Sequence, residues 1–320
     1  MGSMMVTTGT AGQAGSTAAT FVNVLKEPFL RVSEFDASLE TYLFEPESLT
    51  GGNTIQWSRV ERLGVATSPA QLAQGVAPKP VPLTINQVTA LMEEYGNAVY
   101  ISTFATLSTR QPLVQQAVKI LGYNNKEVRD RLLYAIANAA TNVFRVNDRA
   151  NDNAIEVNDT VSFEEISQVK AELRKAGAPT KPDGTYHLVL HSEQYSSIET
   201  DANWLAMSQF AYAEDIRRGR VSMVLGVTIH ETNSNSFVKT ASTTSGNSDS
   251  IRSAFICGAE AAKVTDLKAT EMHMQPPGQG SDWAKRRTQL GWTVTFKGAI
   301  VNETFIRKIR ASSADAVAVA

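Results

Sequence analysis

The sequence has little of the chemistry from which most active sites are built. Its 320 residues include one cysteine, Cys257, and four histidines. A single cysteine excludes an internal disulfide and every metal site that needs several cysteines. Four histidines leave little material for a histidine-built active site. There is also no phosphate-binding loop and no nucleophile-elbow motif, so the sequence carries no signature of catalysis or of cofactor binding.

Net charge and long apolar runs are lacking as well. The 30 lysines and arginines nearly balance 32 aspartates and glutamates, whereas proteins that grip nucleic acid through its phosphates usually carry a marked basic excess. No run of about 18 or more apolar residues occurs, which excludes a membrane-spanning helix. The first twenty residues lack the basic start and apolar centre of a signal peptide. The 42% apolar content indicates a globular protein, which we expect in a reducing compartment.

The first part of the chain predicts an arm and a hairpin. Residues 1–20 carry no charge, and a helical pattern follows them. Two alternating runs centred on Ile55 and Ile85 predict the strands of the hairpin, and residues 97–102 predict a third strand. Residues 64–82, between the hairpin strands, are rich in Gly, Ala, Gln and Pro. A connection of about twenty residues without clear structure usually serves a function or a partner, so we expect a long projecting hairpin.

The most strongly helical stretch runs from about Pro112 to Phe144. Proline suits a first helical position, and Gly122 to Asn125 could bend or break the helix. At 1.5 Å per residue the helix would be a rod of roughly 50 Å, which needs an extended surface to lie against. Its apolar stripe consists of Val114, Val118, Leu121, Val128, Leu132, Ile136 and Val143.

A polar break at residues 147–158 is the expected domain boundary. Beyond it, Ser162 and Glu165 form a capping box at the start of a helix. Residues 233–250 and 275–281 are rich in small polar residues, Gly or Pro and predict exposed loops. Strands are predicted at 186–191, on both sides of Gly226, and at 254–257, 291–300 and 303–310, with a short helix at 201–210.

Three chemically distinctive residues have simple structural interpretations. His187 and His191 are four apart in an alternating strand, where that spacing separates them by roughly 13 Å. This is too far for the two rings to share a metal ion. Cys257 lies between apolar residues, which is typical of a small buried side chain. We therefore expect no catalytic residue, no metal and no cofactor.

Two basic clusters stand out, at residues 217–220 and 285–287. They fit solvated loops, ion pairs between subunits, or weak contacts with phosphates, because arginine is a bidentate donor to carboxylates and phosphates alike. Neither cluster has the size or the interleaved aromatic residues of a dedicated nucleic-acid surface. The arm, hairpin, long helix and polar loops bury little within one subunit, which favours burial against copies of the same chain.

Several short blocks occur in a characteristic order along about residues 50–310. They are Gly52–Arg59 and Tyr95–Ser102 in the hairpin region, Ala139–Val143 at the expected end of the long helix, and then Trp204, Gly226–Thr232, Gly258–Ala261, Gln289–Asn302 and Arg307. With these blocks the chain resembles the major capsid proteins of tailed bacteriophages, which have the HK-ninety-seven-like fold. More narrowly, it resembles the coliphage N-four-like major capsid family.

The resemblance implies an α+β fold with five parts. It also implies a structural protein without enzymatic activity, made in the host cytoplasm and located in the virion capsid. The parts are an N-terminal arm (1–50), an extended hairpin or E-loop (51–95), a peripheral domain (96–158) with a spine helix at about 112–144, an axial domain (159–287), and C-terminal strands (288–320) that return to the peripheral domain.

The resemblance further implies the partners. They are the chain itself, in pentamers and hexamers of an icosahedral shell, non-specifically enclosed double-stranded DNA, and portal, scaffolding or decoration proteins; no membrane is involved. Two alternatives stay open, an encapsulin-like shell of a cellular nanocompartment and a soluble enzyme with an unrecognised site. The candidate contacts between subunits are Trp57, Arg59, Glu61, Arg62, Arg217, Arg218, Arg220, Arg286 and Arg287.

Overall fold

The computed structural model describes residues 39–48, 51–61, 74–75, 82–108, 113–156, 158–203, 223–234, 237, 240–241, 250–279 and 282–312. These residues form helices and three β-sheets. They divide into two compact units, each built from separate stretches of chain. Of the described residues, unit 1 contains those within 94–126 and 270–294, and unit 2 contains those within 35–93, 127–269 and 295–320.

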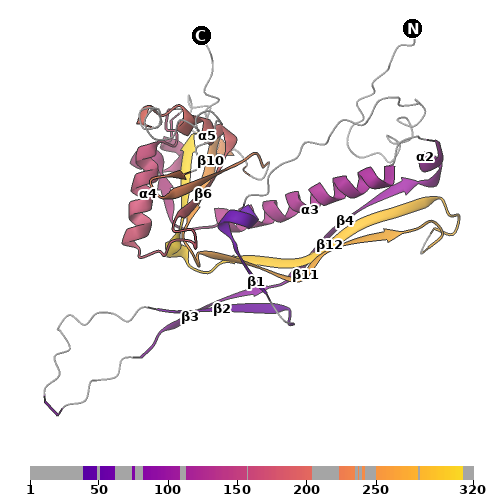
Figure 1. Ribbon diagram of the computed structural model, residues 1–320, viewed down its shortest axis with the longest axis horizontal. Helices are drawn as coiled ribbons and strands as arrows, with labels where there is room; N and C mark the ends of the chain where they lie inside the picture. The colour runs from indigo at the N-terminus through magenta and orange to yellow at the C-terminus, as the bar shows by residue number, and fades with distance from the viewer. Residues whose placement is uncertain are drawn as a thin grey trace, which may run out of the picture. The chain divides into compact units, whose positions relative to one another are not determined.

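The largest sheet belongs to unit 2 (Figure 1). In sheet order its strands are β5 (Val143–Arg145), β13 (Ile306–Ser312), β10 (Ser250–Cys257), β6 (Tyr186–His191), β8 (Val227–Thr232) and β7 (Met223–Val224), and β9 (Thr240–Ala241) pairs with β10. Strand β10 is antiparallel to β13 and β6, whereas β6 is parallel to β8. A parallel pair needs a crossover connection, and helix α5 (Ser192–Glu199) lies in the connection from β6 to β8.

Helix α4 (Phe163–Lys175) packs against this sheet through the apolar stripe expected from the sequence. Ile166, Val169 and Leu173 are fully buried, in one cluster with side chains of β6, β8 and β10. Burying each such side chain stabilises the fold by roughly 1.5–3 kcal/mol. The helix begins with the predicted capping box, in which the Ser162 N–H donates to Glu165.

A second sheet has four strands, and helix α3 (Leu113–Asn138) covers one of its faces. The strands, in order, are β1 (Glu45–Ser48), β11 (Ala262–Gln275), β12 (Arg287–Ile300) and β4 (Glu93–Ser102). In unit 1 the Asn124 side-chain oxygen of α3 accepts hydrogen bonds from Asn97 Nδ2 at 3.0 Å and from Trp292 Nε1 at 3.2 Å. These bonds tie the helix to β4 and β12 (Figure 1).

Strand β12 alternates in burial because its even-numbered side chains face α3. Trp292, Val294 and Phe296 are almost completely buried, while the odd-numbered residues between them are half-exposed. Further along β12, in unit 2, the residue on the side that faces α3 is Gly298. A Cβ at this position would stand 2.7 Å from Leu133 Cδ2 of α3. Glycine at this position therefore lets the helix and the strand approach closely.

The third sheet is the predicted hairpin. Strands β2 (Thr54–Val60) and β3 (Ile85–Leu91) pair antiparallel, from Thr54 opposite Leu91 to Val60 opposite Ile85. No described helix is long and apolar enough to cross a membrane. The remaining elements are short: the π-helical turn η1 (Leu39–Leu43), helix α2 (Thr103–Ser108), and the 3-10 turns η2 (Val146–Asp148), η3 (Asp152–Ala154) and η4 (Glu303–Phe305).

The long helix is shorter than predicted, because it ends at Asn138 rather than near residue 144. Its 26 residues span about 39 Å at 1.5 Å per residue. The Lys308 amine caps this end by donating to the Asn138 carbonyl at 2.8 Å. Val143, expected on the helix stripe, instead pairs with Lys308 in the parallel strands β5 and β13. Gly122 to Asn125 does not break the helix.

Two further expectations need correction. The segment 233–250 is not wholly an exposed loop, because Ser234 and Phe237 are fully buried and β9 pairs with β10. The sequence patterns did not predict β11, because its 14 residues are mostly exposed beyond Thr265 and lack an apolar alternation. The predicted helix at 201–210 lies mostly outside the described residues, and the predicted domain boundaries stay predictions.

Two glycine-to-alanine variants should shift stability in opposite directions. Gly122 lies inside α3, and a Cβ added there would meet no atom within 4 Å, so Gly122→Ala should raise the free energy of unfolding by about 1 kcal/mol. At Gly258 a Cβ would overlap the Pro179 carbonyl oxygen, so Gly258→Ala should lower it by about 2 kcal/mol. Urea unfolding of both variants measures the two changes, and a loss of stability in Gly122→Ala would contradict the helix assignment.

Candidate assembly surfaces

The base of the hairpin is anchored to its own chain. Ile55, Trp57, Ala90 and Met92 form a small buried cluster, and the Trp57 indole N–H donates to Glu47 Oε2 at 2.6 Å. Trp57 is 4% exposed, so it offers almost no surface to a second copy. This candidate contact residue is therefore an internal anchor of the hairpin in the described structure.

The outer half of the hairpin is exposed. We use this name for Val60, Leu83 and Ile85, each of which is more than half exposed. Beside them Arg59 and Glu61 approach each other to 3.9 Å, and Glu61 also accepts a hydrogen bond from Asn86. The outer half thus presents apolar side chains with a pair of opposite charges. Arg62 lies outside the described residues.

Unit 1 carries the most exposed large apolar side chains of the described surface. Phe104 and Leu107 on α2 are 74% and 86% exposed, and Trp283, in the turn between β11 and β12, is 91% exposed. The Thr103 N–H donates to the Arg286 carbonyl at 2.9 Å, which holds α2 against that turn. We call Phe104, Leu107 and Trp283, which lie on these two linked segments, the apolar end of unit 1.

The basic residues of the 285–287 cluster lie at this apolar end. Asp282 accepts the backbone N–H groups of Arg286 and Arg287 at 3.0 Å each and that of Gly278 at 3.3 Å. These bonds lower the pKa of Asp282 and fix the turn. The Arg287 guanidinium lies 5.0 Å from the centre of the Tyr100 ring, a cation–π distance. Arg217, Arg218 and Arg220 lie outside the described residues.

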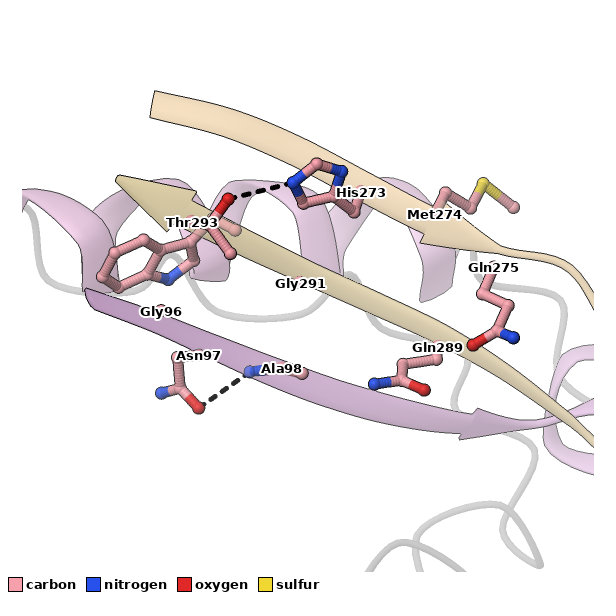
Figure 2. Close-up of a pocket in the computed structure, with 10 residues that line it drawn as sticks. Gly96, Asn97, Ala98, His273, Met274, Gln275, Gln289, Gly291 and Thr293 are labelled. Atoms are coloured by element: carbon pink, nitrogen blue, oxygen red, sulfur yellow. Dashed lines mark hydrogen bonds between the residues drawn. The ribbon is translucent and has the colours of Figure 1, made fainter. Parts of the chain in front are cut away.

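The face of the four-stranded sheet that points away from α3 contains a shallow hollow in unit 1 (Figure 2). Its volume is about 380 Å³, and its floor is low because Gly96 and Gly291 have no side chains. A Cβ on Gly96 would stand 2.7 Å from the Trp292 carbonyl oxygen. Among the lining residues only His273 has an ionisable side chain, and its Nε2 lies 3.0 Å from Thr293 Oγ1. The lining of the hollow therefore lacks the pair of acid and base groups that general acid–base catalysis would need.

The histidines and the cysteine singled out in the sequence make contacts that stabilise the fold. His191 Nδ1 accepts the Glu193 N–H at 3.2 Å at the start of α5, while His187 Nε2 lies 2.7 Å from Asp183. The two histidines therefore serve different contacts. Cys257 is fully buried, and burial raises the pKa of its thiol to about 11, which confirms the prediction of a small buried side chain. Within the described residues no group of three or more His, Cys, Asp and Glu could hold a metal ion.

Comparisons with known proteins identify the fold. No protein-family model matches the chain, and no curated protein does. Solved structures match over nearly all of it. The cyanophage Pam1 capsid chain has a TM-score of 0.74 at 13% identity, covering 98% of this chain and 100% of that one. The capsid of Ralstonia phage GP4 gives 0.68 at 14% identity, with coverages of 99% and 100%.

A third match is the head of Helicobacter pylori bacteriophage KHP40, with a TM-score of 0.66 at 12% identity over 96% of this chain and 99% of that one. The chain thus has the α+β fold of phage capsid proteins, as its resemblance to the HK-ninety-seven-like fold implied. Identities this low show the fold alone. The narrower resemblance to the coliphage N-four-like family stays a prediction.

Replacement of Trp57 should loosen the hairpin without loosening the large sheet. Trp57→Ala removes the centre of the hairpin cluster, and such truncations cost about 3 kcal/mol. Trp57→Phe keeps an aromatic ring but loses the bond to Glu47 and part of the buried ring volume, so it should cost less than Trp57→Ala and at least about 1 kcal/mol. Hydrogen exchange should accelerate in β2 and β3 of Trp57→Ala while β6 and β10 stay protected. Equal acceleration in β6 would show that the hairpin is not a separate cooperative part.

Proposed function

We propose that this chain is the major capsid protein of a tailed double-stranded DNA phage, and that its copies assemble through pentamers and hexamers into an icosahedral shell. The observation that carries the proposal is the match of nearly the whole chain to nearly the whole of several phage capsid chains. A shared fold does not assign a function by itself. The exposed surfaces of the hairpin and of unit 1 supply the second argument, because a single subunit leaves them uncovered.

The two apolar surfaces are the main contacts between copies in this proposal. The hairpin is the E-loop, and its outer half lies across a neighbouring subunit. The apolar end of unit 1 is covered by another copy. Large apolar side chains that are exposed together usually mark an interaction surface, and burying a side chain the size of leucine or larger supplies about 2 kcal/mol.

Charged residues around these surfaces set the partner and the orientation. Rim charges steer association and disfavour wrong pairings, while each exposed pair adds only about 0–1 kcal/mol. Arg59 and Glu61 flank the outer half of the hairpin, and Arg286 flanks the apolar end. The full set proposed as contacts is Arg59, Glu61, Arg62, Arg217, Arg218, Arg220, Arg286 and Arg287.

The enclosed partner in this proposal is double-stranded DNA, held without sequence specificity. A formal net charge of −2 for the chain is compatible with a shell lining that does not grip phosphates, and strong phosphate binding would hinder packaging. Portal, scaffolding or decoration proteins complete the particle, and the chain joins the virion capsid after synthesis in the host cytoplasm. An encapsulin-like nanocompartment has the same fold but encloses a protein.

Expression of the full chain tests the proposal directly. We expect closed particles with pentamers and hexamers by size exclusion and electron microscopy, and DNA inside particles purified from infected cells. A small monomer that persists under all conditions, including co-expression of the other head proteins, would overturn the proposal. A protein cargo in place of DNA would favour the nanocompartment instead.

Substitutions at the apolar end should weaken assembly and leave the subunit intact. Each of Leu107→Ser and Trp283→Ser removes an exposed apolar side chain, so the free energy of unfolding of the unassembled subunit should change by less than about 0.5 kcal/mol. Loss of about 2 kcal/mol per contact should raise the concentration needed for assembly at least about tenfold. Light scattering against protein concentration measures this threshold.

Met223→Ser is the matched control, because Met223 is exposed on β7 of unit 2 and is not part of the apolar end. We expect its assembly threshold to stay closer to that of the unmodified chain. If Leu107→Ser and Trp283→Ser assemble at the same protein concentration as the unmodified chain, the apolar end is not a contact between copies. That result would not contradict the proposed shell function.

A further inference from the structure

Three aromatic rings from separate elements of unit 2 meet beside η1. The rings of Tyr42 and His230 are stacked, with centroids 3.5 Å apart and planes inclined by 9°. His187, on the neighbouring strand β6, has its ring centroid 4.9 Å from that of His230 and 6.3 Å from that of Tyr42. Two of the four histidines in the chain therefore form one cluster with the tyrosine, which we name the ring stack.

The ring stack buries imidazole nitrogens that have no hydrogen-bond partner among the described residues. These atoms are Nδ1 of His187 and Nε2 of His230. Buried polar groups of native proteins are nearly always paired. A buried imidazole nitrogen without a partner can be accommodated while it carries no proton. A proton added to that nitrogen would find no hydrogen-bond acceptor.

Ionisable groups lie near His230 on several elements. Strand β6 supplies His187, and the segment before β6 supplies Asp183 and the buried Lys181. From η1 comes Tyr42, and β1 supplies Glu45, which lies 3.8 Å from the Lys181 amine. Burial lowers the pKa of His230 to about 4, and the neighbouring His187 and Lys181 add to this effect while Asp183 opposes it. On β10, Cys257 pairs with His187 and carries a buried thiol.

The ring stack joins η1, the first described element, to the large sheet. Around Tyr42, the Leu43 carbonyl accepts from Lys181 at 3.4 Å and from the Cys257 thiol at 3.7 Å. Arg129 of α3 holds Glu40 through Nε at 2.9 Å. Apart from the ring stack, η1 is thus held by polar contacts of its backbone and of Glu40, together with the burial of Leu39 and Leu43.

We propose that the ring stack is a proton-sensitive clamp, which holds η1 on the large sheet while His230 is neutral and releases η1 when His230 takes up a proton. Protonation would bury a positive charge beside Lys181 and His187 with no new acceptor. Detachment of Tyr42 lets water reach the ring and removes this penalty. The clamp is a property of the single chain and does not depend on the proposed function.

The sign of the pH effect follows from linkage. A histidine whose pKa is lower in the packed state than in the open state binds fewer protons when packed, so acid favours opening. With the pKa of His230 at about 4 in the packed state and 6.5 as its ordinary value, the clamp is intact above pH 6.5 and weakens as the pH falls toward 4. Between pH 7 and pH 5 the opening equilibrium should shift by about twentyfold.

Hydrogen exchange of residues 39–48 in the full-length chain tests the clamp. After correction for the intrinsic rate at each pH, the opening constant should rise about twentyfold from pH 7 to pH 5. In His230→Phe, which keeps a ring to stack on Tyr42 but cannot titrate, the change should stay below about threefold. His273→Phe is the matched control, because His273 is exposed in unit 1, and it should behave like the unmodified chain.

Two outcomes of the exchange experiment would overturn the clamp. One is an unmodified chain whose exchange in this segment does not depend on pH after correction. The other is the same twentyfold rise in His230→Phe, which would assign the effect to Glu40 and the other carboxylates near η1.

A measurement on the unmodified chain keeps the test valid if His230→Phe does not fold. The chain has only four histidines, so a histidine-selective NMR titration can resolve each ring. The His230 resonance should titrate below pH 5 in the intact chain, and Tyr42→Leu should move its midpoint upward. A midpoint at the ordinary histidine value in the unmodified chain contradicts the proposal.

Discussion

The packing of one long helix on one long strand is the constraint on which much of the structure depends. Every even-numbered side chain of β12 from Thr288 to Phe296 is buried, and contacts with α3 recur along this side. Trp292 meets Asn124, Phe296 meets Arg129, and Gly298 leaves room for Leu133. Side chains repeat every two residues along one face of a strand and every 3.6 residues around a helix. The side chains of a long strand and a long helix therefore fit together only where small or polar residues adjust the distance between the two backbones.

Because α3 packs on one face of the four-stranded sheet, the other face of this sheet and the hairpin do not contact the apolar side of the helix. The opposite face stays open in unit 1, with the hollow around Gly96 and Gly291. The outer half of the hairpin and the apolar end of unit 1 also remain uncovered. At η1, by contrast, the ring stack of Tyr42, His187 and His230 closes the chain onto the large sheet.

Sequence patterns predicted several elements from a local apolar period. These are the hairpin strands, the helix after Ser162, strand β6 and the strands around Gly226. The patterns were wrong where a distant residue decided the structure. Helix α3 stops at Asn138 because Lys308 caps it and β13 pairs with Val143, and Phe237 is buried although its neighbours are small and polar. Of the candidate contacts, Trp57 was placed correctly on β2, but its burial depends on Glu47 and Ala90.

The sequence by itself determined the scarcity of reactive side chains and the apolar period of several helices and strands, because both can be read without knowledge of any contact. The α+β fold followed from the resemblance of short sequence blocks to phage capsid proteins. Only the tertiary structure decided which of these residues meet. His187, His230 and Tyr42 are far apart in the sequence and carry no shared motif, yet parallel pairing of β6 with β8 brings the two histidines side by side under Tyr42. Contacts between distant segments depend on strand register and on helix packing, and neither is written in any local stretch of residues.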